Sequence, residues 1–415
     1  MLDIQFIRDN PKEVKKGVAA KQFDPKLVDK VLELDKKRRD LVAKVDELRS
    51  QRNRLAREKR INEGKQVKEK LQGIEPQLEE VEKEFLDILN QIPNLPLPQV
   101  PVGKNEKENV EVRRWGTPRD FGKDGFEPKD HLELGQSLGI LDFETGAKVA
   151  GSQFYYLYGD GALLELALVQ YAFEVLQKEG FEPVITPDLA KSRYYLGTGY
   201  APRGKEAQTY VIEGEDLGLI ATAEVTLAGR HADEIIPEEK LPIKYIGYSH
   251  CFRQEAGAYG KYSKGLYRVH QFTKAEMFIF CKPEESEAMH EHILQMEEKI
   301  YQNLGLPYRV VEMCTADLGA MAARKFDIEA WMPSRNDYGE VTSTSNCTDY
   351  QARNLNVKLK RKNGKTEYLH MLNGTAIATS RTPLAILENY QQKDGTIIIP
   401  DVLRKWIGKE KITRG

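Results

Sequence analysis

The first quarter of the chain carries an apolar pattern that repeats over two long stretches. From Leu27 to Leu55 the repeating positions are separated alternately by four and three residues, and a second stretch runs in the same way from Leu71 to Ile92. This spacing of about 3.5 residues is typical of the seam of a coiled coil. The sequence therefore predicts two long helices whose apolar edges face each other.

The segment between the two stretches decides how these helices are connected. Residues 61–65 contain a glycine among polar residues and carry the turn signal. Two helices joined by a short turn pack antiparallel, so we expect a coiled-coil hairpin over about residues 26–92. Pro76 should kink the second helix or mark a fresh start, because proline removes a helical hydrogen bond.

The pattern changes near residue 100. Four prolines between residues 92 and 101 end the second helix and predict a stiff linker. Residues 160–179 then follow a helical period, and later segments alternate polar and apolar residues with period two. Because long alternation of strands and helices is absent, we expect an α+β fold, an antiparallel sheet with helices against it. The predicted domains are residues 1–100, which contain the hairpin, and residues 101–415.

Polar side chains interrupt the apolar pattern on two predicted strands. Arg253 and Glu255 would share one face of the first strand. One face of the second strand would carry Phe272, Lys274, Glu276 and Phe278. On a solvated outer face the charges would be unremarkable, but the aromatic residues would not fit. In a binding site the aromatic ring offers a stacking plane, the cations meet phosphates, and the acids bind an ammonium group or a base edge. The pattern alone leaves both interpretations open.

Two further segments carry candidate polar groups. If residues 220–225 are extended, Thr222 and Glu224 project the same way. Residues 372–383 are typical of a strand that runs into a helix, which puts Arg381 beside a helix N-terminus. Free N–H groups and the helix dipole favour anions there. An arginine at this place is compatible with a phosphate contact and also with a plain surface charge.

Charge modifies the interpretation of the hairpin. The whole chain has a net charge of -2, so any nucleic-acid binding must come from a local basic surface. Residues 26–60 hold 13 Lys and Arg against 7 Asp and Glu, whereas residues 63–92 hold 4 against 8. A coiled coil with solvated faces explains these charges, and a phosphate backbone lying against the first helix also explains its basic bias.

The cysteine spacing and the absence of certain motifs argue against several classes of protein and of binding site. The four cysteines lie 30 or more residues apart without a CxxC pair, so neither a structural zinc site nor a disulfide framework is expected. The N-terminus does not resemble a signal peptide and no apolar stretch reaches membrane-spanning length, so we expect a cytoplasmic protein without a membrane partner. No P-loop or Rossmann glycine motif is present.

Taken together, these segments resemble the class II aminoacyl-tRNA synthetases, and in particular the bacterial type of the seryl-tRNA synthetase family. Class II motif 1 is similar to residues 180–187, motif 2 to residues 252–276 and motif 3 to residues 373–388. The most specific features are the hairpin and the runs Thr222-Ala223-Glu224, Val269-His270-Gln271-Phe272 and Leu372-Asn373-Gly374-Thr375. The resemblance covers nearly the whole chain and implies an N-terminal tRNA-binding domain followed by a class II catalytic domain.

The resemblance also implies a role for each matching position. The ATP-binding positions would be Arg253, Gln254, Glu255, Val269, Phe272, Glu340, Val341, Thr342, Ser343 and Arg381. The serine-binding positions would be Thr222, Ala223, Glu224, Glu276 and Thr375. Arg253 and Arg381 would act as catalytic residues on the α- and γ-phosphates, and Phe272 would stack on adenine. Glu340 and Ser343 would hold Mg²⁺ with ATP, and Glu276 would bind the serine ammonium group.

The implied reaction has two steps. The serine carboxylate attacks the α-phosphorus of ATP to give seryl-adenylate and pyrophosphate, and the seryl group then passes to a terminal ribose hydroxyl of tRNA(Ser), or of tRNA(Sec) in organisms that have it. Neither step needs a protein nucleophile. The resemblance further implies a homodimer whose hairpin meets tRNA across subunits. No zinc is expected, because the spaced cysteines and the Thr222/Glu224 pair argue against the zinc-using archaeal subtype.

Two alternatives share parts of this pattern. An amino-acid:carrier-protein ligase would keep motifs 2 and 3 but should lack the long hairpin. A catalytically silent paralogue of the seryl-tRNA synthetases should have lost some of Arg253, Glu255, Glu276 or Arg381, and all four are present. The serine–tRNA ligase interpretation is therefore the hypothesis to test.

Overall fold

The computed structural model describes residues 1–200, 209–255 and 264–414. Within them the chain divides into two compact units, Met1–Pro96 and Leu97–Gly415. In the described parts of the chain, none of the helices combines the length and the apolar composition that a membrane crossing requires. The four cysteines are all free and buried, and all of them belong to the second unit.

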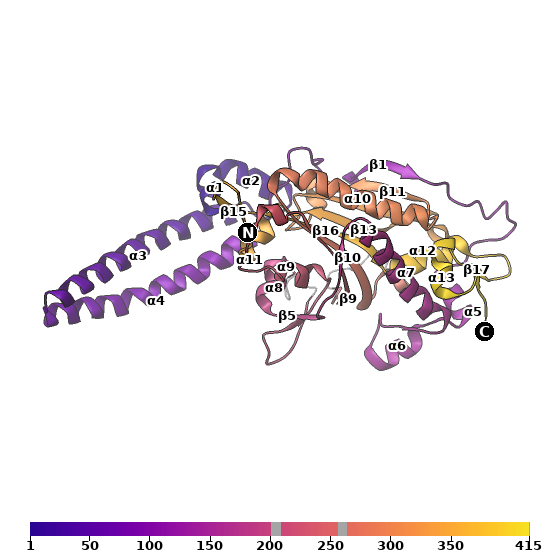
Figure 1. Cartoon of the computed structure of the whole chain (residues 1–415), viewed down its shortest axis with the longest axis horizontal. Helices are drawn as coiled ribbons and strands as arrows, with labels where there is room; N and C mark the ends of the chain where they lie inside the picture. Colours follow the sequence, from indigo (N-terminus) through magenta and orange to yellow (C-terminus); the bar gives the residue numbers. More distant parts are fainter. Residues whose placement is uncertain (201–208, 256–263, 415) are drawn as a thin grey trace. The chain divides into compact units, whose positions relative to one another are not determined.

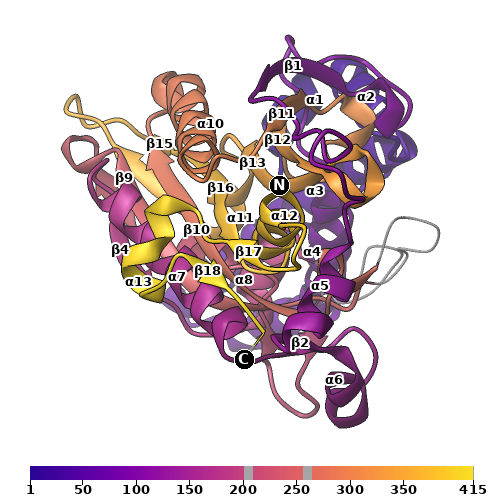
Figure 2. The same cartoon turned by 90° about the vertical axis from the view of Figure 1, so that its right-hand side faces the viewer.

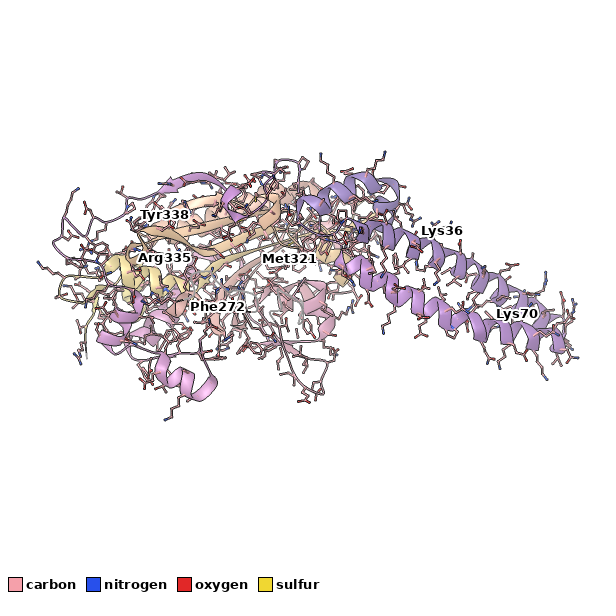
Figure 3. All side chains as sticks on the ribbon, turned by 180° about the vertical axis from the view of Figure 1, so that it is seen from behind. Lys36, Lys70, Phe272, Met321, Arg335 and Tyr338 are labelled. Atoms are coloured by element: carbon pink, nitrogen blue, oxygen red, sulfur yellow. The ribbon has the colours of Figure 1, made fainter. Side chains whose placement is uncertain are left out.

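The first unit is helical throughout. It comprises α1 (Ile4–Asp9), α2 (Pro11–Ala20), α3 (Lys26–Arg57) and α4 (Ile61–Gln91). Figure 1 shows α3 and α4 running side by side as a long hairpin, and Figure 3 marks the exposed Lys36 and Lys70 on these two helices. The predicted coiled-coil hairpin is confirmed.

The turn of the hairpin lies a few residues before the predicted place. Helix α3 ends at Arg57 and α4 already begins at Ile61, so residues 61–65 are helical rather than a turn. Lys59 takes the left-handed conformation with a φ of 58°, and Arg60 binds Glu63 through two nitrogen–oxygen contacts of 2.7 and 2.6 Å. The glycine that suggested the turn, Gly64, is therefore a half-buried residue inside α4.

Helix α4 continues without interruption through Pro76, so the predicted fresh start is wrong. The seam around it stays packed, and its members are Val45, Leu48, Leu55, Val67, Leu71, Ile74 and Leu78. At the seam position Arg38 the guanidinium lies 5.1 Å from the ring centroid of Phe85 and 3.9 Å from Glu82. The guanidinium charge of Arg38 thus stays at the edge of the apolar seam, while the aliphatic part of its side chain covers apolar surface.

The second unit is built on an eight-stranded sheet. In spatial order its strands are β1 (Val110–Trp115), β11 (Tyr308–Glu312), β12 (Arg324–Met332), β13 (Asp337–Asn346), β16 (His370–Ala378), β10 (Gln271–Cys281), β9 (Ile243–Phe252) and β4 (Glu182–Ile185). All neighbours are antiparallel except β4 and β9, which are parallel. The predicted α+β architecture with an antiparallel sheet is confirmed.

Helices cover both faces of this sheet. Helices α7 (Asp160–Gln177), α10 (Ser286–Asn303) and α12 (Arg381–Tyr390) pack with Met277 and Ile279 of β10 in the main core. The short helices α9 (Glu224–Gly229) and α11 (Tyr350–Leu355) pack on the opposite face, with Phe278 and Phe280. Figure 2 shows α7 beside α13 (Arg404–Ile407) at the β4 edge.

The remaining α-helices and β-strands of the second unit are short. They are α5 (His131–Leu138), α6 (Phe143–Ala150), α8 (Ser192–Gly197), β2 (Leu141–Asp142), β3 (Tyr156–Leu157), β5 (Leu189–Ala190), β6 (Tyr210–Val211), β7 (Gly218–Leu219), β8 (Ile235–Pro237), β14 (Lys358–Lys360), β15 (Thr366–Tyr368), β17 (Ile397–Ile398) and β18 (Lys411–Ile412).

Candidate active site

An open cavity of about 290 Å³ lies at the sheet of the second unit. Strand β10 supplies one of its walls, because residues two apart along a strand face the same side. Of the predicted site residues, the lining contains Glu224, Arg253, Glu255, Val269, Phe272, Glu276, Glu340, Val341, Thr342, Ser343, Thr375 and Arg381. Phe272 and Met321, which both line it, are marked in Figure 3. Segments far apart in the sequence thus converge on one cavity.

Buried acids dominate one side of the cavity. Glu276 on β10 accepts a hydrogen bond of 3.2 Å from the hydroxyl of Thr375 on β16. Glu224 at the start of α9 accepts hydrogen bonds from Gln351 Nε2 (2.7 Å), Asn373 Nδ2 (3.0 Å) and the Tyr200 hydroxyl (2.9 Å). Burial, helped by the charge of Glu276, raises the pKa of Glu224 to about 7. This side can therefore bind an ammonium group and a hydroxyl.

Two arginines also line the cavity. The Arg253 guanidinium lies 5.2 Å from the ring centroid of Phe272, and its Nε donates to the Ala221 carbonyl over 3.3 Å. Arg381, the first residue of α12, has its Nη1 2.9 Å from Glu340 Oε1, and its guanidinium lies 4.7 Å from the ring centroid of Tyr267. Burial alone would lower the pKa of Arg381, but the Glu340 carboxylate raises it above the ordinary value. Both cations can therefore meet phosphate oxygens.

An aromatic ring, that of Phe272, also lines the cavity. Phe272 packs with Cys251, Val269 and Ala378 in a small apolar cluster, so one side of its ring is supported. Glu255 forms an ion pair with Arg268 and has a φ of 50°. A planar base can stack on such a ring, while the neighbouring polar groups bind its edge.

Strand β9 ends at Phe252, so Arg253 and Glu255 lie beyond its last residue. The prediction that they share one strand face is therefore wrong, although both line the cavity. The face predicted for β10 is correct: Phe272 and Glu276 line the cavity, while Phe278 packs on α9 residues further along the same face.

Three predicted site residues are not part of the lining. Ala223 is buried in a core cluster, and the Gln254 side chain donates to the Thr209 carbonyl over 2.9 Å. The Thr222 hydroxyl accepts a hydrogen bond of 3.2 Å from the Glu224 amide, just before α9. Segment 220–225 is thus a helix start and not extended, so the predicted geometry of the Thr222/Glu224 pair is wrong. Thr222 supports the start of α9, which aims Glu224 into the cavity.

The residues expected to hold Mg²⁺ present hard oxygen donors. Glu340 and Ser343 both lie on β13 and line the cavity. Opposite Ser343 on β12 lies Asp327, whose buried Oδ1 accepts no hydrogen bond from any described residue, with Lys325 Nζ at 3.5 Å. Across residues 1–200, 209–255 and 264–414, no three His, Cys, Asp or Glu side chains are grouped to hold a metal. Such a donor set fits Mg²⁺ that arrives with phosphates and keeps several waters.

Comparison with known proteins gives matches over both units. A family model for the seryl-tRNA synthetase N-terminal domain matches residues 1–96, and a model for the tRNA synthetase class II core domain (G, H, P, S and T) matches residues 209–390. A serine–tRNA ligase of Dictyoglomus turgidum is 54% identical over 99% of this chain and 99% of its own length. One of Treponema denticola is 51% identical over 99% of this chain and 100% of its own length.

The chain belongs to the seryl-tRNA synthetase family. Solved structures agree with this membership: the seryl-tRNA synthetase of Pyrococcus horikoshii complexed with ATP has a TM-score of 0.91 and 42% identity, with 100% of both chains covered. The cytoplasmic serine–tRNA ligase of Naegleria fowleri in complex with AMP has a TM-score of 0.87 and 38% identity, with 100% of this chain and 99% of the other covered. The two alternatives, a carrier-protein ligase and a silent paralogue, are not favoured.

Several lining residues of this family member were not among the predicted site residues. They include Tyr200, Lys274, Lys325 and Asn373. The sequence did contain an indication of Lys274 and Asn373. Lys274 lies on the polar face predicted for the second strand, and Asn373 lies in the run Leu372-Asn373-Gly374-Thr375. Tyr200 and Lys325 come from segments without a polar pattern, so only the tertiary structure brings them to the cavity.

Proposed function

We propose that this chain is a serine–tRNA ligase that activates L-serine with ATP and transfers the seryl group to tRNA(Ser). The observation that carries the proposal is that one cavity is lined by buried acids, an aromatic ring and two arginines. These groups can bind the serine ammonium group, the adenine ring and the phosphates of ATP, respectively. Membership in the seryl-tRNA synthetase family supports the same substrates.

Serine would enter the acidic side of the cavity. Glu276 would accept hydrogen bonds from its ammonium group, while Glu224 and Thr375 face the rest of the molecule. A pocket with polar groups aimed at a hydroxyl disfavours alanine and glycine, because those groups would stay buried and unpaired. Threonine must be rejected by space alone, and one methyl group is worth only about 1–3 kcal/mol in an uncrowded pocket.

ATP would occupy the remaining length. Its adenine would stack on Phe272 beside Glu255 and the Val269 backbone, and its phosphates would meet Arg253 and Arg381. Because the serine carboxylate is itself the nucleophile, these residues would act by positioning the reactants and by offsetting charge that develops at the α-phosphorus. No protein side chain needs to form a covalent intermediate.

Glu340 and Ser343 would hold Mg²⁺ together with the ATP phosphates. When bound, Mg²⁺ neutralises charge on phosphate oxygens. Arg381 pairs with Glu340 in the free chain, so phosphate binding would exchange this ion pair for a phosphate contact. The carboxylate would then be available as an oxygen ligand.

The first unit would bind tRNA. The basic helix α3 would lie along phosphates, which orients the nucleic acid without reading its bases. We also propose a cytoplasmic homodimer. Exposed apolar side chains support it: Ile185 on the edge strand β4 is 79% exposed, and Leu163 and Leu166 on α7 are 41% and 57% exposed. Light scattering of the purified chain would give twice the monomer mass, and substitution of Ile185 by arginine would shift it toward the monomer.

The test of the catalytic proposal is ATP–pyrophosphate exchange by the purified chain. Serine should support exchange far better than threonine, alanine or glycine. Exchange with another amino acid and none with serine would refute the substrate assignment. Deletion of residues 30–90 should leave exchange nearly intact and severely lower tRNA charging, whereas equal loss of both reactions would make the hairpin part of the catalytic fold.

A further inference from the structure

A buried lysine lies among the groups proposed to bind serine. Lys274 is on β10 between Phe272 and Glu276 and lines the cavity, although it is only 5% exposed. Its Nζ lies 2.7 Å from Glu276 Oε2 and 3.5 Å from the Thr375 hydroxyl oxygen. It therefore touches two of the groups proposed to contact serine, although it is not itself one of the groups proposed to bind serine or ATP.

The surroundings explain why a cation is needed there. Glu224 and Glu276 are 2% and 1% exposed, and two carboxylates in a small buried volume repel each other and favour uptake of a proton. The charge of Glu276 adds to burial in raising the pKa of Glu224, while Lys274, Gln351 and Tyr200 oppose the rise. Without a nearby cation, one acid would be neutral and would donate a hydrogen bond instead of accepting one.

Other charged and titratable groups face the same pair of acids. Tyr200 follows α8, Cys251 lies near the end of β9 with Arg253 just beyond that strand, and Glu297 lies on α10. Arg253 also carries positive charge, but it lies over the Phe272 ring. Lys274 is the described cation that forms an ion pair with Glu276.

We propose that Lys274 is a positioning residue for serine recognition: its ammonium group holds the Glu276 carboxylate in place and offsets its charge, so that Glu224 also faces the substrate as a carboxylate. This inference rests on the proposed function, serine activation in this cavity. Glu276 is then available to accept hydrogen bonds from the ammonium group of serine, and Glu224 to accept them from the rest of the molecule, while the cation that keeps both acids ionised belongs to the protein.

The pH dependence of serine use follows from this arrangement. In the wild-type chain we expect kcat/KM for serine to rise with pH through about 7, because burial raises the pKa of Glu224 to about that value and its carboxyl group then loses its proton. In the Lys274→Met variant the rise moves to higher pH, because the charge that opposed protonation of Glu224 is gone. A shift of about one unit leaves roughly a tenth of Glu224 ionised at pH 7 instead of about half. With the lost orientation of Glu276, we expect KM for serine to increase about tenfold at that pH.

The experiment measures ATP–pyrophosphate exchange of the full chain between about pH 6 and 8.5, with serine and ATP varied separately. Lys274→Met and Lys274→Gln should both raise KM for serine at pH 7, leave KM for ATP within about threefold, and recover as the pH rises. The matched control is Lys325→Met, which removes a cation from the same cavity beside Asp327. This control should leave the pH midpoint for serine in place.

A double variant separates this role from simple structural support. Glu224→Gln imitates a Glu224 that is no longer ionised, so adding Lys274→Met to it should cost less than Lys274→Met costs in the wild type. An equal cost in both backgrounds, or an unmoved pH midpoint, would overturn the proposal. A wild-type chain without serine-dependent exchange would refute the proposed function instead, so the two failures are distinguishable. Thermal unfolding with ATP present confirms that each variant is folded.

Discussion

Gly374 is a residue at which a single added methyl group should be felt directly. It lies on β16 between Met277 of β10 and Thr344 of β13, so strands fix it on both sides. A β-carbon at this position would lie 2.2 Å from Ile293 Cγ2, 2.9 Å from Glu297 Oε1 and 3.1 Å from Thr344 Oγ1. Gly374→Ala therefore forces an adjustment between β16 and α10.

The size of the effect follows from these distances. Apolar carbons are normally about 3.5–4.0 Å apart, so the 2.2 Å contact falls short by more than an ångström. Ile293 is completely buried, which leaves it little room to move away. Overpacking of this kind typically costs about 1–3 kcal/mol. We expect about 3 kcal/mol for Gly374→Ala, because the sheet cannot yield on either side.

The three tryptophans offer a suitable assay. Trp115, Trp331 and Trp406 all belong to the unit Leu97–Gly415, so urea unfolding followed by tryptophan fluorescence reports on that unit. Gly374→Ala should lower its midpoint. The control is Gly73→Ala on α4, where an added β-carbon meets nothing within 4 Å. That change should leave the fluorescence midpoint unmoved while it stabilises the hairpin by up to about 1 kcal/mol.

A double-mutant cycle decides whether the clash with Ile293 is the cause. Ile293→Ala alone leaves a cavity and should cost about 2–5 kcal/mol. If the cause is the clash, the Gly374→Ala/Ile293→Ala variant should be more stable than the sum of the two changes predicts, by at least about 1 kcal/mol. Additive costs, or an unchanged midpoint for Gly374→Ala alone, would refute the reasoning.

Three further predictions concern activity. Glu224→Gln should flatten the rise of kcat/KM for serine through pH 7, since the wild-type rise comes from deprotonation of that carboxyl group, and a retained rise would point to another titrating group. Phe272→Ala should raise KM for ATP about 5- to 150-fold through lost stacking, while Phe272→Tyr stays near wild type; an equal rise in KM for serine would contradict the assigned role. Charge reversal of Lys36 on the basic α3 should lower tRNA charging more than charge reversal of Lys70 on α4 does, and the difference should be larger at low salt. ATP–pyrophosphate exchange should be unchanged in both variants. Equal effects of the two reversals would disconnect the basic bias from tRNA.

The periodic parts of this fold could be predicted from sequence, and local conformations could not. The heptad seam predicted the hairpin because its stability comes from a repeating apolar edge. Its turn was misplaced because Gly64 suggested a break, whereas the chain reverses at Lys59 with a positive φ. A glycine inside a helix costs only about 1 kcal/mol, which the flanking seam residues offset.

In the candidate active site, too, the periodic pattern could be predicted from sequence and the local conformations could not. Alternation along β10 correctly put Phe272, Lys274 and Glu276 on the face that lines the cavity, whereas Phe278 on the same face packs in a core cluster. The extended conformation expected at Thr222 and Glu224 was wrong because of a local hydrogen bond. The Thr222 hydroxyl accepts the backbone N–H of Glu224, and helix α9 begins there. Tyr200 and Lys325 reach the cavity only through tertiary packing, so no pattern in their own segments could indicate them.

The burial of the four native thiols has a practical consequence for the hairpin. Because Cys251, Cys281, Cys314 and Cys347 are all buried in the second unit, a maleimide dye should react slowly with the native chain. A single cysteine placed at Gln51, an exposed position of α3, would then be labelled selectively without replacing any native residue. Fluorescence anisotropy at that position would follow the motion of the hairpin before and after tRNA is added, in an enzyme whose catalytic unit is unaltered.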